Sequence, residues 1–266
     1  MENYLEVNQV TIAYPRSGRI VDAVSNVSFG VSHREFVALV GPSGCGKTTL
    51  LHAIGGLVPV KEGQIRCGGR VITRPGPERV MVFQEFSLLR WRTARRNVEF
   101  ALECNNVPCE KRRQIVECLL KQVGLERHMD AYPDQLSGGM KQRVTMARAL
   151  AYNADLLLMD EPFGALDAQT RLTMQALLLD IWEGSEKTVL FVTHDIDEAI
   201  YLADRILIMS TGPGTIKAEY RVKAIRPRPI DFLISGEFLD LKRRIFSAIR
   251  AEDFQRTPQH EQKAIV

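Results

Sequence analysis

The sequence predicts an α/β protein built on a mainly parallel sheet, and two observations support this. Short, continuous apolar runs alternate with segments of helical periodicity, which favours parallel strands joined by right-handed crossovers. Several of these runs are followed at once by glycine or polar residues, as buried parallel strands commonly are. The 266 residues are enough for one sizeable core with satellite subdomains.

Strand patterns fill the N-terminal part of the chain. Residues 3–12 and 24–31 alternate between apolar and polar side chains, as half-buried strands do. Residues 36–40 are apolar throughout and end at Gly41, which predicts a buried strand, and residues 47–57 then predict a helix.

The pattern changes in the middle of the chain. Glycines bracket a short hairpin within residues 62–69, and residues 80–83 form an apolar run that ends at Gln84. From about residue 85 to 153 the periodicity is helical, so we expect a helical insertion there.

Three further apolar runs predict strands at residues 156–159, 189–192 and 205–209. Residues 221–229 are basic and contain proline, which is typical of a linker. A helical stripe follows, formed by Phe238, Leu241, Ile245 and Ile249.

Bulk composition is that of an ordinary soluble protein, with 45% hydrophobic residues and a net charge of +3, too small to indicate a nucleic-acid partner. No apolar run approaches the ~20 residues that span a bilayer, and no secretion signal is visible, so we expect a cytosolic protein. The five cysteines contain no C-x-x-C pair, which argues against zinc.

A glycine-rich loop between a predicted strand and a predicted helix matches G-x-x-x-x-G-K-[ST], the phosphate-binding pattern. Its backbone N–H groups would surround phosphates at the positive end of the helix dipole. We expect Lys47 to reach the terminal phosphates and the Thr48 hydroxyl to bind Mg²⁺. The predicted nucleotide-binding residues are Gly41, Pro42, Ser43, Gly44, Cys45, Gly46, Lys47, Thr48 and Thr49.

Three other predicted strands end in polar residues, and carboxyl ends of parallel strands share one edge of a sheet. Asp160 is the predicted metal-binding acid, and Glu161 beside it is the predicted base for an attacking water. His194 is expected to contact the γ-phosphate or that water, although a lone histidine at a strand end is more often structural. Gln84 is expected to sense the metal or the water.

Two positions in this nucleotide site have alternative interpretations. Tyr14, before Pro15, either stacks on an adenine ring or belongs to a packed turn. Cys45 is either an oxidation-sensitive switch or a small residue that fits a tight loop.

Ser137, Gly138 and Gly139 open another predicted helix, with serine as its cap and exposed backbone N–H groups beyond it. This second anion site is expected to lie too far from the phosphate loop to bind the same nucleotide. A head-to-tail dimer would let each Ser137 close the site of the other copy.

Together these segments make the chain similar to ATP-binding cassette (ABC) transporter ATPases, over about residues 5–215. The resemblance implies a P-loop NTPase (RecA-like) core with an antiparallel β subdomain and a helical subdomain. It divides the chain into an ATPase domain, residues 1–220, with a helical subdomain at about 85–155, and a C-terminal linker and amphipathic helix, residues 221–266.

The resemblance also implies site roles and partners. It makes Leu136–Arg143 the family signature, Asp167 part of a D-loop at the nucleotide, and His194 a switch histidine. Two subunits are implied to enclose two ATP molecules, with Mg²⁺, and to act on integral-membrane permease subunits at the cytoplasmic face of the inner membrane. A solute-binding protein would be an indirect partner, and no nucleic acid is implied.

Finer motifs, among them Pro77–Gln84 and Glu161–Asp167, resemble bacterial importers of nitrate, sulfonates, taurine or bicarbonate. Arg90 departs from the Leu-Leu-Pro-Trp sequence usual there. The basic run of Arg90, Arg92, Arg95 and Arg96 either meets a cytoplasmic loop of the permease or is a solvated face near anionic lipid. The transported solute is not predictable from this chain.

Two other functions compete with import. A soluble ABC ATPase acting on nucleic acid or ribosomes usually carries tandem cassettes, coiled-coil arms or zinc modules, and none is evident in the sequence. An unrelated P-loop kinase would make the signature segment accidental.

Overall fold

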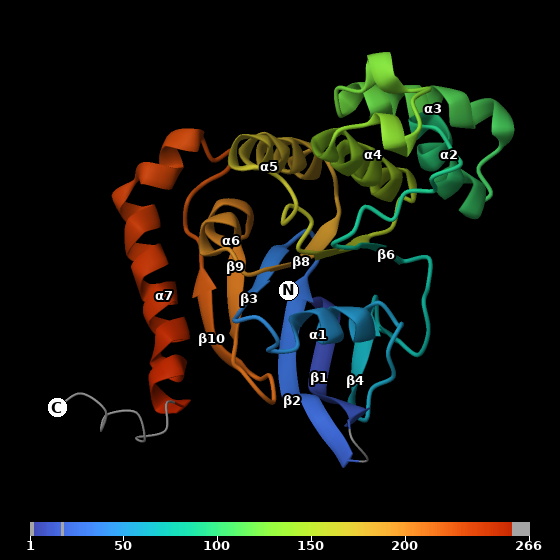
Figure 1. Cartoon of the computed structure of the whole chain (residues 1–266). Helices are drawn as coiled ribbons and strands as arrows, with labels where there is room; N and C mark the ends of the chain where they lie inside the picture. Colours follow the sequence, from blue (N-terminus) through green and yellow to red (C-terminus); the bar gives the residue numbers. More distant parts are fainter. Residues whose placement is uncertain (1–2, 17–18, 257–266) are drawn as a thin grey trace.

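A six-stranded sheet with an apolar core on each face organises the computed structural model, which describes residues 3–16 and 19–256 (Figure 1). The strand order is β10-β9-β3-β8-β7-β6, and all but β10 run parallel. The predicted strands are present, as β3 (Phe36–Val40), β6 (Arg79–Val82), β7 (Leu156–Asp160), β8 (Thr188–Thr193) and β9 (Arg205–Met209). The edge strand β10 (Ile216–Arg221) was not predicted.

A second, antiparallel sheet covers one face. It has the order β2-β1-β4-β5 and consists of β1 (Asn3–Arg16), β2 (Arg19–Ser32), β4 (Glu62–Cys67) and β5 (Arg70–Val71). Helix α1 (Lys47–Ile54) packs between the two sheets, and its Leu50, Leu51 and Ile54 are fully buried. The predicted helix to residue 57 is too long, because Gly56 takes a left-handed conformation that ends it early.

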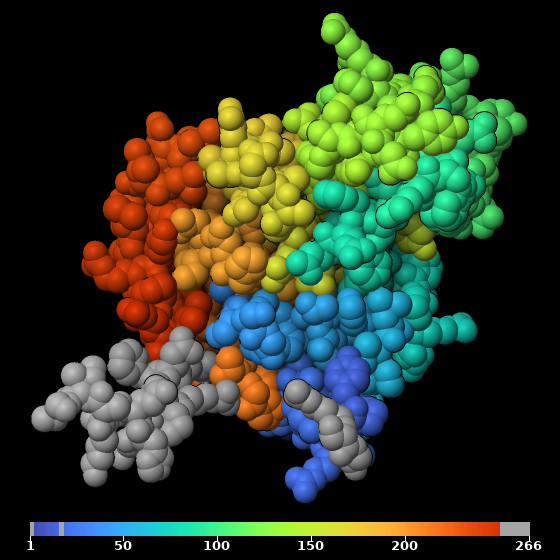
Figure 2. Space-filling view, viewed as in Figure 1, coloured from blue at the N-terminus to red at the C-terminus, as the bar shows by residue number. Residues whose placement is uncertain are grey.

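Helices cover the opposite face of the six-stranded sheet. Figure 1 shows α5 (Ala168–Glu183), α6 (Ile196–Leu202) and α7 (Gly236–Arg256) on that side. The predicted helical insertion is a separate lobe of α2 (Ala94–Cys104), α3 (Cys109–Gln122) and α4 (Gly138–Ala151), with two short 3-10 turns before α4. In the space-filling view this green lobe projects beyond the rest of the molecule (Figure 2).

The C-terminal segment packs against the core on the helical face of the six-stranded sheet. The predicted apolar stripe on α7 is confirmed, since Phe238, Leu241 and Ile245 are buried. Within the predicted linker, Arg226 contacts the Trp182 ring and Arg228 is buried against the end of α6. This stretch is therefore held in place by basic side chains that point inward.

Among the described residues, none of the helices combines the length and the apolar character that crossing a bilayer requires.

Candidate functional site

The carboxyl ends of neighbouring strands bring the predicted site together. In the parallel register, Val40 of β3 lies opposite Thr193 of β8, and Asp160 of β7 lies opposite Val192 of β8. The loops that follow these strands therefore emerge side by side. This is the edge at which parallel sheets of this type bind ligands.

The phosphate loop joins β3 to α1, and its glycines are sterically required. A Cβ on Gly41 would lie 2.5 Å from the Met209 carbonyl oxygen, and Gly46 caps α1 with φ of 99°. Lys47 Nζ donates to the carbonyl oxygens of Gly41 at 2.8 Å and of Pro42 at 3.0 Å. The ammonium group is therefore held over the loop, where it can meet phosphate oxygens.

Cys45 lies at the base of this loop and is fully buried. Burial raises the pKa of its thiol, and the nearby Lys47 ammonium only partly opposes that effect. A buried thiol with a raised pKa is a poor nucleophile. The structure therefore favours the interpretation of Cys45 as a small residue that fits the loop.

Two oxygen donors meet beside the loop. The Thr48 hydroxyl donates to Asp160 Oδ1 at 3.0 Å, and Asp160 is almost fully buried. Burial raises the pKa of the Asp160 carboxyl, and the Thr48 hydrogen bond counteracts this in part. A hydroxyl next to a carboxylate is the hard-oxygen environment that Mg²⁺ prefers, so these residues fit the predicted metal.

Glu161, the acid next to Asp160, faces His194, the predicted switch histidine. Glu161 Oε2 lies 3.0 Å from His194 Nδ1, and the Glu161 N–H donates to the Val192 carbonyl at 2.9 Å. Glu161 has a φ of 42°, an uncommon conformation for a non-glycine residue that costs about 1–3 kcal/mol. The chain thus turns sharply after Asp160, so that two consecutive acids point to different partners.

Gln84 lies in the exposed segment that follows β6 and leads to the helical lobe. A pocket of about 770 Å³ is lined by Gln84, by Lys141 on α4 and by Ala165 before α5. The segment after β6, helix α4 and the turn before α5, which lie far apart in the sequence, therefore line one cavity. The pocket also contains Arg90.

The predicted signature segment forms as expected. Ser137 caps α4, and its hydroxyl accepts from the Met140 N–H at 3.3 Å. A Cβ on Gly138 would meet only Leu166 at 3.8 Å, whereas one on Gly139 would lie 2.7 Å from Thr170. These glycines thus border the start of α5, whereas the glycines of the phosphate loop border Val24 and Met209.

The remaining predicted residues lie near the ends of elements. Asp167 caps α5 and accepts from the Thr170 N–H at 3.0 Å, which lowers the pKa of its carboxyl. Tyr14 lies on β1 opposite Val21 and is 39% exposed, so its ring is open to a stacking partner. The roles of all these residues stay predictions at this point.

Sequence reasoning missed a support for the phosphate loop. Gly214, between β9 and β10, donates to the Ala23 carbonyl and accepts from the Ser25 N–H, both at 3.0 Å. A Cβ there would collide with the Cys45 carbonyl. Gly214 belongs to the stretch of residues 210–216 that resembles the importers, but nothing in that stretch indicated a contact with the phosphate loop.

The basic run on the lobe is less positive than the sequence suggested. Arg92 pairs with Glu103 at 2.9 Å, and Arg95 pairs with Glu117 at 2.9 Å. Arg90 is exposed, and its neighbour Trp91 is 74% exposed. The outward-facing part of the run therefore consists of Arg90, with Trp91 beside it, and of Arg96, which is also exposed.

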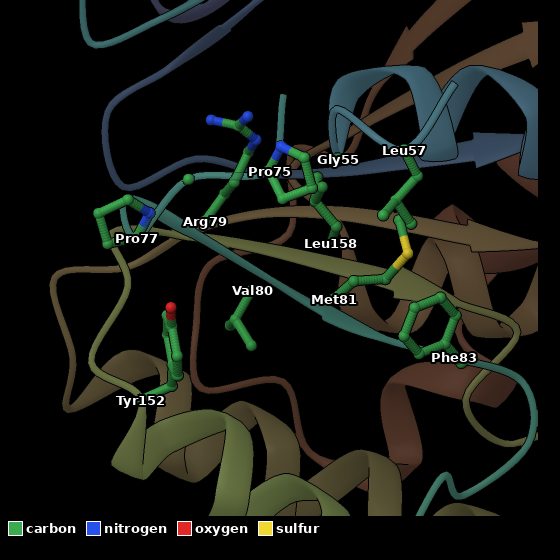
Figure 3. Close-up of a pocket in the computed structure, with 11 residues that line it drawn as sticks. Gly55, Leu57, Pro75, Pro77, Arg79, Val80, Met81, Phe83, Tyr152 and Leu158 are labelled. Atoms are coloured by element: carbon green, nitrogen blue, oxygen red, sulfur yellow. The ribbon is translucent and has the colours of Figure 1, made fainter. Parts of the chain in front are cut away.

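A separate apolar pocket of about 370 Å³ lies along β6 (Figure 3). Figure 3 shows Met81, Phe83 and Tyr152 around it, with Leu57 from the turn after α1. None of the predicted phosphate- or metal-binding residues lines this pocket.

The chain matches the family model described as ABC transporter over residues 24–164. It is 48% identical over 223 residues to the taurine import ATP-binding protein TauB of Chromobacterium violaceum, covering 84% of this chain and 83% of that one. It is 46% identical over 209 residues to the nitrate import ATP-binding protein NrtD of Synechococcus elongatus, covering 77% and 76%.

A solved structure is also similar. It is an ATP-binding cassette in a dimeric post-hydrolysis state bound to ADP and Pi. The TM-score is 0.74 and the identity 34%, and the match covers 83% of this chain and all of the other.

Proposed function

This chain belongs to the ABC transporter family and is an ATPase, and from that premise we propose that it energises a bacterial importer of a small solute. One observation supports this above the others. The phosphate loop, the Thr48–Asp160 pair and the Glu161–His194 pair follow three adjacent parallel strands. Relatives of comparable length are named for taurine and nitrate import.

We assign the hydrolytic roles by geometry. Glu161 takes a proton from the attacking water, because it is the acid whose carboxylate is not directed at Thr48. His194 orients that carboxylate through its Nδ1 contact and leaves its other ring nitrogen for the γ-phosphate. Lys47 binds the β- and γ-phosphates, and the backbone of residues 43–49 surrounds them.

Magnesium would be held by Thr48 and Asp160, with Gln84 from the segment that follows the neighbouring strand β6. When bound, it would offset phosphate charge and polarise the terminal phosphate. The buried Asp160 carboxyl, with its raised pKa, gains a charge partner when the ion binds.

A second copy of the chain would complete each site. The exposed Ser137 and Gly138 present N–H groups at the start of α4, beside the start of α5 rather than beside the phosphate loop. A head-to-tail dimer would bring this helix end, together with Asp167, to the partner's nucleotide. The similar cassette solved as a dimer supports that arrangement.

The helical lobe would contact the membrane subunits. Arg90 and Trp91 are exposed next to the pocket that contains Gln84, so a cytoplasmic loop of a permease bound there would sense the nucleotide site. The protein would then be peripheral to the cytoplasmic face of the inner membrane, and a solute-binding protein would act on the permease from the other side.

The test uses Glu161→Gln, which keeps the size of the side chain and removes its basicity. We expect ATP to bind with unchanged affinity, turnover to fall by about 10²–10⁴, and a dimer to accumulate on gel filtration with ATP and Mg²⁺. Ser137→Arg in the same background is the matched control, because it blocks the helix end and should leave a monomer. A Glu161→Gln protein that stays monomeric with ATP bound would contradict the composite site.

A further inference from the structure

Helix α5 contacts the segment that carries His194 through two polar side chains. Arg171 Nη1 lies 3.4 Å from Asp195 Oδ2, and Gln175 Nε2 donates to Glu198 Oε1 at 3.0 Å. Arg171 and Gln175 are four residues apart, so both extend from the same face of the helix. Two successive turns of α5 therefore hold the residues that immediately follow the histidine.

The held segment is itself closed by hydrogen bonds around His194. The Thr193 hydroxyl donates to Glu198 Oε2 at 2.5 Å and accepts from the Asp195 N–H at 3.0 Å. Asp195 is the cap of α6, and its Oδ1 accepts from the Asp197 N–H at 2.8 Å. The backbone on both sides of the histidine is thus fixed by side chains bound to α5.

Part of this network is buried, which makes it costly to disrupt. Gln175 and Glu198 are 4% and 5% exposed. Burial raises the pKa of the Glu198 carboxyl, and the nearby Asp195 adds to the effect while Arg171 opposes it. A buried polar group left without its partner costs about 1–3 kcal/mol, so the contacts should persist together.

The same guanidinium also reaches the turn before α5. Arg171 Nη2 donates to the Leu166 carbonyl at 3.1 Å, one residue before Asp167, the cap of α5. One side chain therefore joins the turn that contains Leu166 and Asp167 to the turn that contains His194.

We propose that Arg171 and Gln175 are positioning residues that hold His194 against Glu161 and make its position depend on the Leu166–Asp167 turn. The inference rests on the proposed function, in which Asp167 faces the second copy and His194 serves hydrolysis. A shift of the Asp167 turn on dimer closure would then reach the histidine through Arg171.

The first experiment follows His194 directly and needs no turnover. The ring signals of ¹³C-histidine-labelled full-length protein are recorded by NMR, and His194→Ala assigns the relevant signal. We expect Arg171→Met and Gln175→Met to move the His194 signal. The control is Thr173→Met, an exposed position on the same helix whose hydroxyl bonds only to the Gln169 carbonyl, and it should leave the signal unchanged.

The second experiment measures ATP hydrolysis by the same variants. Because a misplacement of about 1 Å costs up to 10²-fold in rate, we expect kcat of Arg171→Met to fall about tenfold or more while KM for ATP stays within about twofold. Arg171→Lys keeps the charge but loses the fork that reaches two partners, so its kcat should be intermediate.

An unmoved His194 signal in Arg171→Met and Gln175→Met would overturn the proposal, as would an equal kcat loss in Thr173→Met. A wild-type protein without ATPase activity would instead refute the proposed function, and the NMR result would still decide whether α5 positions the histidine.

Discussion

His194 Nδ1 lies 3.0 Å from Glu161 Oε2, which joins a residue after β8 to one after β7. Glu161 is the more enclosed partner, with 20% of its side chain exposed against 62% for His194. The imidazole is therefore the more accessible group of the pair. This contact links the predicted base and the predicted switch into one unit.

The first prediction concerns this unit. His194→Ala should lower kcat by about 10–10²-fold, because the Glu161 carboxylate loses its orienting partner. Adding His194→Ala to Glu161→Gln should lower single-turnover hydrolysis no further, since residues that act as a unit are strongly non-additive. Losses that multiply in the double variant would show that the two residues act separately.

The second prediction concerns pH and Asp160. Burial raises the pKa of this carboxyl in the folded protein, so between the unfolded and folded pKa values the folded state holds the extra proton. The free energy of unfolding therefore falls as pH rises through that range, and the penalty persists above it.

Asp160→Asn removes this penalty and keeps an oxygen for Thr48. In metal-free buffer at neutral pH the variant should melt at a higher temperature than the wild type. The difference should shrink as pH is lowered towards 3.8, the ordinary value for the group. Mg²⁺ with ATP should stabilise the wild type and not the variant; a variant stabilised equally by Mg²⁺ would contradict the metal assignment.

The third prediction separates neighbouring arginines on the lobe. Arg90→Glu should reduce transport by the assembled importer while the isolated subunit keeps its basal hydrolysis, because Arg90 is exposed. Arg92→Glu should instead destabilise the lobe. The Arg92 guanidinium pairs with Glu103 at 2.9 Å, and a glutamate in its place would repel that carboxylate. Transport in vesicles and thermal unfolding distinguish the two, with the exposed Arg127→Glu as control.

The fourth prediction concerns the C-terminal segment. Arg228 Nη1 donates to the carbonyls of Ile200, Tyr201 and Ala203, at 3.2, 2.8 and 2.9 Å. Burial lowers the pKa of Arg228 to about 10, which leaves it charged at neutral pH and favourable at the end of α6.

Arg228→Met should therefore reduce the free energy of unfolding by about 3 kcal/mol, measured by urea denaturation. The exposed Arg243→Met on α7 serves as control and should change it by less than about 0.5 kcal/mol. Equal effects of the two substitutions would mean that Arg228 does not hold the segment.

Much of the site was predictable because its signals are local. A run of four or five apolar residues that ends in a glycine-rich loop or an acid predicts both the strand and the residue at its end. The carboxyl ends of parallel strands lie at one edge of a sheet, and so the sequence predicted that Asp160 and His194 share an edge, as the pairing of β7 with β8 confirms. The role expected of Ser137 came from its place at the start of a predicted helix, whereas that of Asp167 came from the family resemblance.

Contacts between side chains on different elements were not predictable. The hydrogen bonds from Arg171 to Leu166 and Asp195 depend on how α5 lies against α6, and no periodicity in the chain encodes that angle. The same holds for Gly214 beneath Cys45 and for Arg228 at the end of α6, since both come from segments that resembled an ordinary turn or linker.

Local pattern by itself determined where the strands end and which reactive groups stand there, because strand formation and loop chemistry depend on adjacent residues. Packing decided which of those groups touch, as with Glu161 and His194, because contact depends on the order of the strands in the sheet and on the helices that cover it. Those are properties of the whole folded chain.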